Sequence, residues 1–340
     1  MLNFKRPGGT SRGVLHNKET WFLIIREGEN IGIGECGIFR GLSCDDRPDY
    51  EEKLKWTCDH IHLGEEALYN AMTEFPSIQF GIEMAFASLK SEDPFVLFPS
   101  DFTSGTAAIP INGLIWMGDA GFMREQIVQK LEAGFNCIKM KIGAIDFETE
   151  LSLLKSIRNE FSPSEIELRV DANGAFHPGN ALEKLKRLSE YNIHSIEQPI
   201  KPGQGEEMAT LCEVTPLDIA LDEELIGVFS EAEKTALIEM IKPQYVILKP
   251  SLIGGWQGSD SWIEVAGNNN AGWWITSALE SNVGLNAISQ YTFTKNSNLP
   301  QGLGTGSLFT NNIQAPLEVE QGELKYSGKN SWDITPFLNE

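Results

Sequence analysis

The pattern of hydrophobic and polar positions changes along the chain and divides it into a strand-rich start, a helical segment, a long alternating segment and a short tail. Over residues 1–36 the alternation predicts antiparallel strands, among them 19–26 and 31–36 around a Gly28-Glu29-Asn30 turn. From 48 to 90 apolar residues recur at helical spacing, and Pro76 is expected to open the last helix. After residue 316 the pattern predicts a hairpin that packs back on the N-terminal unit.

The alternating segment predicts eight strands separated by seven helices. The strands are expected at 109–114, 137–142, 167–171, 195–198, 218–221, 245–248, 273–276 and 301–304. The helices are expected around 123–133, 147–160, 179–191, 206–214, 230–240, 256–266 and 284–295. A repeat of about 25 residues suits a (β/α)8 barrel whose final helix is missing or eroded. A doubly wound sheet is the alternative, but 112–118 lacks the glycine-rich phosphate turn expected after its first strand.

We therefore predict an α/β fold with two domains. Residues 101–304 form a modified (β/α)8 barrel, and residues 1–100 form an α+β capping domain to which 305–340 return.

Composition and net charge limit the classes of molecule that the protein can bind. The chain has 340 residues and a net charge of −21, which argues against nucleic acid or an anionic membrane as a partner. A small anionic substrate remains possible if lysines or a metal ion are concentrated locally. Five scattered cysteines without a CxxC pair suit reduced thiols, so we expect a cytoplasmic protein. No apolar run approaches the ~18 residues of a membrane helix, and nothing indicates the oligomeric state.

Charged side chains recur at the ends of the predicted barrel strands, where such barrels carry their active sites. Lys139 and Lys141 share one face of the second strand, because side chains two apart in a strand point the same way. Asp171, Glu197 and Asp222 end the next three strands, 26 and 25 residues apart. Taken singly, each has an ordinary alternative: an exposed lysine pair on an edge strand, or an acid at a strand end or helix cap. Their common spacing favours a site.

Three converging carboxylates require a cation between them. Oxygen ligands suit a hard ion, so we expect Mg²⁺, with Mn²⁺ as the alternative. Lys249, after the sixth strand, faces the lysine pair across this arc of acids. A lysine base opposite a second ammonium suits removal of a proton α to a metal-bound carboxylate. We expect neighbouring cations to lower the pKa of such a lysine.

These motifs resemble those of the enolase superfamily, in its muconate-lactonizing-enzyme-like branch, and within that branch those of the o-succinylbenzoate synthases. The matching pieces are Lys139-Met140-Lys141, Asp171-Ala172-Asn173, Glu197-Gln198-Pro199, Asp222-Glu223, the 249–255 segment and the 277–281 segment. Residues 34–36 and 41–43 resemble the capping-domain loop of that family.

The resemblance implies a syn dehydration that belongs to menaquinone biosynthesis, acting on a small-molecule carboxylate. Lys141 would remove the α-proton and then protonate the leaving hydroxide, Lys139 would assist it, and Lys249 would stabilise the enediolate. The implied remaining roles are metal ligands (Asp171, Glu197 and Asp222), residues behind them (Asn173 and Glu223), and a receptor for the substrate's succinyl arm (Ser277 with Gly41, Leu42 and Ser43).

The same lysines also suit a racemase or an epimerase, in which one lysine removes a proton and the other returns it. Dipeptide epimerases of the family carry two acids after the eighth strand, whereas 302–306 reads Gly-Leu-Gly-Thr-Gly. This does not exclude an N-succinyl amino acid racemase, and a cycloisomerase is a further alternative. A non-catalytic barrel that binds an anionic metabolite is disfavoured because Lys141, Lys249 and Asp222 are all present.

Overall fold

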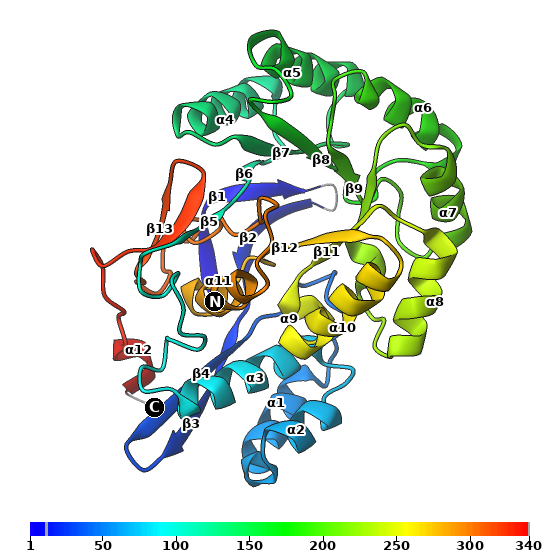
Figure 1. Cartoon of the computed structure of the whole chain (residues 1–340). Coiled ribbons are helices and arrows are strands. Elements are labelled where there is room, and N and C mark those ends of the chain that lie inside the picture. Colours follow the sequence, from blue (N-terminus) through cyan, green and yellow to red (C-terminus); the bar gives the residue numbers. More distant parts are fainter. Residues whose placement is uncertain (11–12, 339–340) are drawn as a thin grey trace.

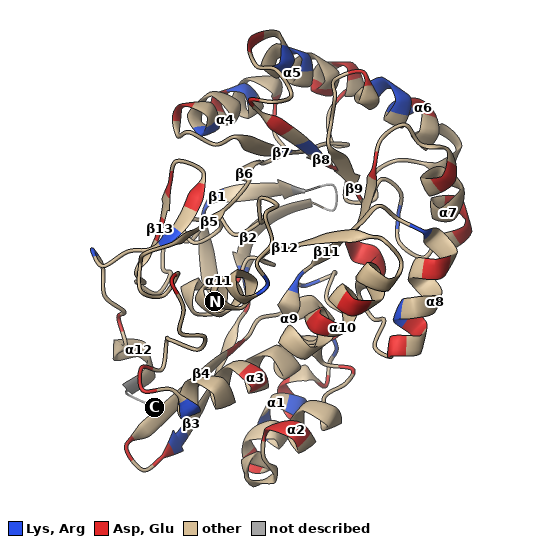
Figure 2. Cartoon of the chain, in the orientation of Figure 1, with Lys and Arg blue, Asp and Glu red and all other residues tan. Residues whose placement is uncertain are grey.

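A computed structural model describes residues 1–10 and 13–338, and its centre is a curled parallel sheet surrounded by helices (Figure 1). Across these residues the sheet has seven strands in chain order. They are β6 (Gly113–Ile115), β7 (Cys137–Lys141), β8 (Glu167–Asp171), β9 (Ser195–Glu197), β10 (Ile219–Leu221), β11 (Tyr245–Leu248) and β12 (Gly272–Ile275). The covering helices are α4 (Ala120–Glu132), α5 (Phe147–Glu160), α6 (Pro178–Ser189), α7 (Gly205–Val214), α8 (Glu231–Ile241), α10 (Gly255–Asn268) and α11 (Asn282–Thr294). The alternating pattern therefore predicted the order of elements correctly. Figure 2 shows acidic residues along the outer helices α7, α8 and α10.

Two predicted strands are altered where the barrel closes. The single strand expected at 109–114 is wrong: β5 (Ala108–Pro110) belongs to another sheet, and β6 begins at Gly113. Pro110 has no N–H to donate, which suits the point where the chain changes sheets. The eighth strand is reduced to two parallel bridges, from Gln301 to Ile111 and from Gly302 to Thr276. These bridges close the ring, and in the described part of the chain the next helix is only the short α12 (Thr335–Leu338).

The N-terminal unit contains the predicted hairpin and helices. β3 (Trp21–Glu27) pairs with β4 (Asn30–Cys36), and they are followed by α1 (Tyr50–Asp59), η1 (Ile61–Leu63), α2 (Glu65–Ala71) and α3 (Pro76–Lys90). Glycine lets α3 lie directly on β4, because a Cβ added at Gly34 would lie 1.9 Å from the Gly81 carbonyl oxygen. The helix is largely buried as a result.

A separate hairpin, β1 (Leu2–Thr10) with β2 (Gly13–Lys18), covers the barrel mouth. Gly9 forms a bridge with Met117, just beyond β6, and the Lys5 amide donates to the Leu308 carbonyl oxygen at 2.8 Å. Figure 1 shows β1 beside β6. The first residues of the chain therefore lie over the part of the barrel where the charged side chains gather.

The C-terminal hairpin is not where the sequence placed it. β13 (Leu317–Glu320) and β14 (Glu323–Tyr326) form the predicted turn, but β14 pairs with β5 and not with the N-terminal unit. Other parts of the described tail do reach residues 1–100. Before the hairpin, the Thr310 amide donates to the Asn3 carbonyl oxygen at 2.8 Å, and after it Trp332 stacks on Phe95 at 4.0 Å and Phe337 packs on Phe22. The sequence does not indicate this pairing, because the apolar pattern of 109–114 favours a single barrel strand.

Two buried glutamates of the N-terminal unit hold barrel helices at their first turns. Glu35 accepts from the amides of Ser281 and Gly284, both at 2.8 Å, where α11 begins. Glu83 accepts from the amides of Trp256 at 2.7 Å and Gln257 at 3.1 Å, where α10 begins. The first amides of a helix lack partners within the helix and favour negative charge. The two units are therefore joined by specific polar contacts as well as by apolar packing.

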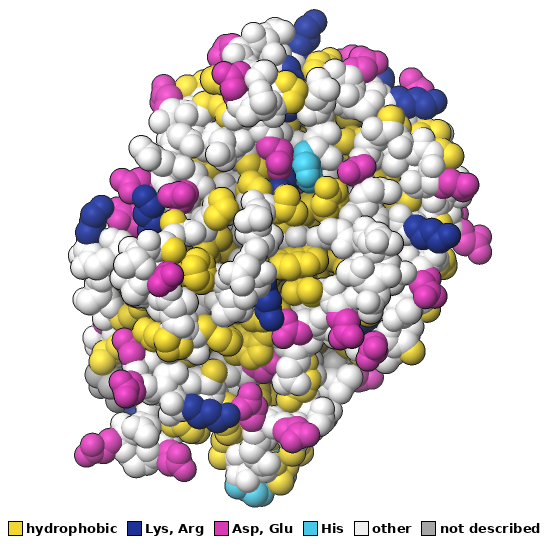
Figure 3. Space-filling view, in the orientation of Figure 1, with side chains coloured by type: hydrophobic (Ala, Val, Ile, Leu, Met, Phe, Trp, Pro, Cys, Tyr) yellow, Lys and Arg dark blue, Asp and Glu magenta, His cyan; other side chains and the backbone are white. Residues whose placement is uncertain are grey.

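The surface view shows apolar side chains gathered in the middle of one face, with charged side chains around its rim (Figure 3). Within the described residues, no helix is long and apolar enough to cross a membrane.

Candidate active site

The register of the sheet brings the predicted site residues into one row. Lys141 is the cross-strand neighbour of Asp171, and Asp171 is the neighbour of Glu197. Asp222 directly follows β10, whose Ala220 pairs with Glu197. All these side chains are buried. The spacing of one β/α unit therefore produced the convergence that the sequence predicted.

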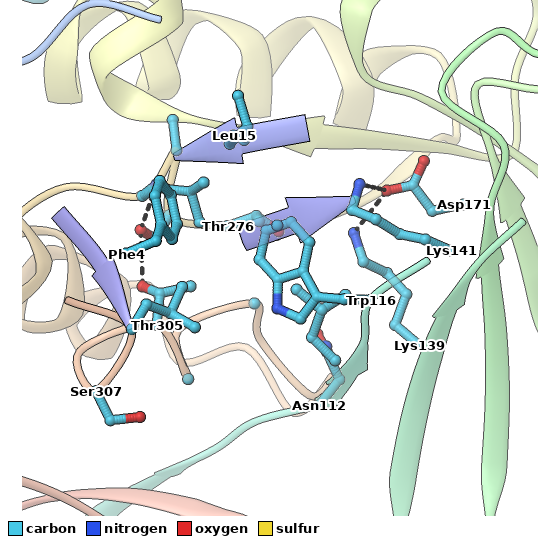
Figure 4. A pocket seen from close by; sticks show the side chains of 18 of the residues that line it. Phe4, Leu15, Asn112, Trp116, Lys139, Lys141, Asp171, Thr276, Thr305 and Ser307 are labelled. Atoms are coloured by element: carbon cyan, nitrogen blue, oxygen red, sulfur yellow. Dashed lines mark hydrogen bonds and ion pairs between the residues drawn. The ribbon is translucent and has the colours of Figure 1, made fainter. Parts of the chain in front are cut away.

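Lysine ammonium groups connect the three acids. Lys139 Nζ donates to Glu197 Oε2 at 2.7 Å and lies 3.3 Å from Asp171 Oδ2. Lys141 Nζ donates to Asp171 Oδ2 at 2.9 Å, and Figure 4 shows both lysines converging on this carboxylate. At the other end Lys249 Nζ pairs with Asp222 and lies 3.9 Å from Glu197 Oε1.

The lysines approach this arc from opposite walls. Lys141 is on β7 and Lys249 follows β11, four places further around the sheet. In a ring of eight positions, four places is half a turn. A substrate carbon held between them would have one ammonium or amine on each face.

The placement of Asn173 and Glu223 behind the metal ligands stays a prediction; in the structure Asn173 itself lines the cavity. Asn173 Oδ1 accepts from Lys141 Nζ at 2.7 Å, and Asn173 Nδ2 donates to Glu223 Oε1 at 3.1 Å. Asn173 therefore fixes the direction of the Lys141 side chain. The sequence analysis gave no role to Gln198, whose Oε1 accepts from the Asp222 amide at 3.1 Å and whose Nε2 donates to Glu224 at 2.9 Å.

At the site, burial and neighbouring charges shift the pKa values of the acids and lysines in opposite directions. Burial alone would raise the pKa of Asp171, but the ammonium groups of Lys141 and Lys139 hold that pKa well below its usual range. Burial raises the pKa of Asp222 well above its usual range, because Lys249 offsets it only in part and other carboxylates add to it. Burial also works to lower the pKa values of Lys139 and Lys249, but the carboxylates outweigh it and raise both.

The site opens into a cavity of about 390 Å³ between the barrel and the β1–β2 hairpin. Trp116, just beyond β6, forms one wall: its ring centroid lies 6.0 Å from Lys141 Nζ. Gly8 of β1 packs on this ring, since a Cβ added there would lie 3.0 Å from it. Phe4 and Leu15 of the hairpin also line the cavity (Figure 4).

The residues predicted to receive the substrate arm are only partly in the cavity. Ser277 and Leu42 line it, whereas Gly41 and Ser43 are not among its described lining residues. Ser43 Oγ instead accepts from the Phe39 amide at 2.8 Å, which shapes the loop. Ser277 Oγ donates to Glu280 at 2.6 Å and accepts from Thr305 Oγ1 at 3.0 Å, so its one proton is committed within the protein.

Several residues that line the cavity were not predicted, both apolar side chains and two threonines at strand ends. Phe4, Leu15, Trp116 and Thr276 line the cavity, and Thr305 follows the 301–304 segment. In the parallel register Ile115 pairs with Met140, so Trp116 has on the first barrel strand the position that Lys141 has on the second. Its place in the repeat could have identified it.

The donor set fits a divalent cation in charge and chemistry. Among the described residues, no three His, Cys, Asp or Glu side chains stand in a group that could hold a metal ion as they lie, because ammonium groups stand between the acids. However, four acids (Asp171, Glu197, Asp222 and Glu223) face three lysines. Glu197 Oε1 is buried and accepts no hydrogen bond from any described residue. Excess carboxylate charge around an oxygen acceptor of this kind suits a small hard ion.

The sequence matches a known protein family over most of the barrel. The family model described as "Enolase C-terminal domain-like" matches residues 122–329, which is more than half of the chain. The chain belongs to the enolase superfamily.

Relatives within this superfamily include enzymes of several activities. The chain is 46% identical to the o-succinylbenzoate synthase of Desulfotalea psychrophila, with 96% of this chain and 97% of that protein covered. It is 29% identical to the o-succinylbenzoate synthase of Thermosynechococcus vestitus over 74% of this chain and 73% of that one. The crystal structure of MenC from D. psychrophila superposes with a TM-score of 0.83, at 42% identity and with 95% of this chain and 99% of that chain covered. A dipeptide epimerase from Enterococcus faecalis, solved with Mg and L-Leu-L-Tyr, shares the fold at a TM-score of 0.81 but only 19% identity, over 97% of this chain and 95% of that chain.

Proposed function

We propose that the chain is an o-succinylbenzoate synthase. It would remove water from 2-succinyl-6-hydroxy-2,4-cyclohexadiene-1-carboxylate to give o-succinylbenzoate, a step of menaquinone biosynthesis in the cytoplasm. One observation carries the proposal: Lys141 and Lys249 lie at opposite ends of a buried arc of three acids, in a chain 46% identical to an enzyme of that name.

Lys141 is the proposed base and acid. Its Nζ is held by Asp171 and Asn173 at the edge of the cavity, where it can reach a ring carbon next to a carboxylate. In the neutral form it takes the α-proton. It then returns this proton to the hydroxide that leaves from the same face, so that one side chain serves both half-reactions.

Lys249 and Lys139 remain charged in this scheme. Their raised pKa values keep both protonated at neutral pH. Lys249 places a positive charge on the opposite face of the ring, where it stabilises the negative charge that develops when the proton leaves. Lys139 holds the carboxylates of Asp171 and Glu197 in position.

Asp171, Glu197 and Asp222 are the proposed ligands of Mg²⁺, with Mn²⁺ as a substitute. The bound ion would supply electrostatic stabilisation of the substrate carboxylate as its α-carbon loses the proton. The chain's own contribution is to bury these oxygens and to exclude bulk water from them.

The cavity disfavours the epimerase alternative. An epimerase of dipeptides must bind an α-ammonium group, which calls for a carboxylate in the cavity wall. Of the described residues that line it, only Asp171 is acidic, and Lys141 and Lys139 already bind it. The 302–306 segment contributes glycines and Thr305 instead.

The test is turnover by the purified protein with Mg²⁺ in ²H₂O. Loss of the diene absorbance and formation of o-succinylbenzoate are expected. Lys141→Ala should lower kcat by about 10³-fold or more, and Lys141→Arg, which keeps the charge beside Asp171, should lose about as much. Lys155→Ala on the exposed face of α5 is the matched control and should behave as the wild type. Deuterium appearing at Cα of an N-succinyl amino acid, with no dehydration of the diene, would overturn the assignment in favour of a racemase.

A further inference from the structure

The cavity wall has the opposite charge to the protein as a whole. The chain carries 48 Asp and Glu against 27 Lys and Arg. Yet the described lining residues include six cations and one acid, Asp171. The cations are Lys5, Arg6, Lys130, Lys139, Lys141 and Lys249. Chance placement of charges would give more acids than bases.

Three of these cations take no part in the catalytic cluster. Lys5 and Arg6 are on β1, and Lys130 is in the last turn of α4. Within residues 1–10 and 13–338, none of the three side chains has an ion pair or donates a hydrogen bond. Although the chain is rich in acids, no described carboxylate therefore neutralises these three charges.

Lys130 is the informative member, because it is partly buried. A Cβ added at Gly113 would lie 3.1 Å from Cγ and Cδ of Lys130, so its stem packs against β6. Its Nζ lies 4.8 Å from the centroid of the Phe135 ring. Burial lowers the pKa of Lys130. Holding a cation there without a carboxylate is unfavourable for folding, which indicates a ligand that is not part of the chain.

All three cations line the same cavity, and they come from two different elements. Phe122, Gln126, Gln129 and Lys130 form one stripe of α4 that lines it. Lys5 and Arg6 line the cavity from the hairpin. We call Lys5, Arg6 and Lys130 the outer cation group.

We propose that the outer cation group binds the second carboxylate of a dicarboxylate substrate and draws such substrates into the cavity. The inference rests on the proposed function, in which one carboxylate occupies the metal site and the succinyl carboxylate is left over. A net charge of −21 repels dianions at long range. A local group of cations beside low-dielectric walls reverses that field over about one Debye length, ~8 Å at physiological salt.

The first test separates binding from chemistry. The Arg6→Gln/Lys130→Gln double variant should lose about tenfold in kcat/KM at low salt, with kcat within about twofold of wild type. Its kcat/KM should also fall less steeply with added salt. Lys186→Gln, an exposed lysine on α6, is the control and should change neither. An unchanged kcat/KM and salt dependence, or a loss confined to kcat, would overturn the proposal.

The second test needs no turnover. Calorimetric titration with o-succinylbenzoate and with benzoate compares a dicarboxylate with a monocarboxylate, both in the presence of Mg²⁺. The double variant should bind o-succinylbenzoate about tenfold more weakly and benzoate as the wild type does. Equal effects on both ligands would refute the outer cation group. A wild type that does not dehydrate the diene would refute the proposed function instead, so the two failures are distinguishable.

Discussion

The buried Lys234 on α8 offers a sharp test of the electrostatics of this fold. Only 3% of the residue is exposed. Its Nζ donates to the Gly258 carbonyl oxygen at 3.3 Å and lies 5.4 Å from the centroid of the Trp262 ring. Burial lowers its pKa from 10.5 to about 8. We predict that Lys234→Met stabilises the protein at neutral pH.

The magnitude follows from the pKa difference. A shift of about 2.5 pKa units corresponds to about 3 kcal/mol against the charged form in the folded state. The Met variant also loses the contacts with Gly258 and Trp262, which reduces its gain in stability by about 1 kcal/mol. The net gain in the free energy of unfolding should therefore be about 2 kcal/mol below pH 8.

The lowered pKa of Lys234 also predicts how the free energy of unfolding changes with pH. The unfolded chain binds the Lys234 proton more tightly than the folded one, so wild-type stability should rise between about pH 8 and pH 10.5. The advantage of Lys234→Met should shrink across this window and change sign near its upper end, where only the loss of about 1 kcal/mol from the missing contacts remains. Urea unfolding of both proteins from about pH 6 to about pH 10 measures it, with Lys155→Met as an exposed control. A difference that stays constant over this range would refute the reasoning.

The remaining predictions concern the site. Asn173→Leu removes an acceptor from Lys141 and should lower kcat by about 10²-fold with little change in the melting temperature. Ser277→Ala leaves the buried Glu280 with one hydroxyl donor fewer and should reduce the free energy of unfolding by about 1–3 kcal/mol in urea titrations. Trp116→Leu removes the wall between Gly8 and Lys141, and steady-state kinetics should show a larger rise in KM than fall in kcat. Removal of divalent ions with EDTA should abolish turnover and Mg²⁺ should restore it, whereas an unchanged rate in EDTA would contradict the proposed ligands.

The sequence was sufficient for the barrel and for the row of charged residues at its mouth, because both depend on local periodicity. The interval between Asp171, Glu197 and Asp222 equals one β/α unit, and a parallel sheet in register converts that interval into proximity. The alternation of Lys139 and Lys141 gave their common face for the same reason.

The features that the sequence did not predict depend on contacts between segments that are distant in the chain. Strand character in residues 1–18 does not say what the hairpin covers; its position follows from Gly8 lying on Trp116, more than 100 residues away in the chain. Lys130 appears in the sequence as an ordinary basic residue of an amphipathic helix. Only its packing on Gly113 places it at the cavity. The 109–114 error has the same origin, since β14 competes with the barrel for this segment.

Glu35 and Glu83 limit which N-terminal halves and barrels from different members of the superfamily can be combined in one chain. Each accepts hydrogen bonds from backbone amides at the open end of a helix that belongs to the other half of the molecule. A barrel expressed alone would expose those helix ends together with the apolar surface beneath α3. A chimera that carries a foreign N-terminal half should fold only if it brings two carboxylates to the same places, and a library of such chimeras would be enriched for survivors by fixing these two positions first.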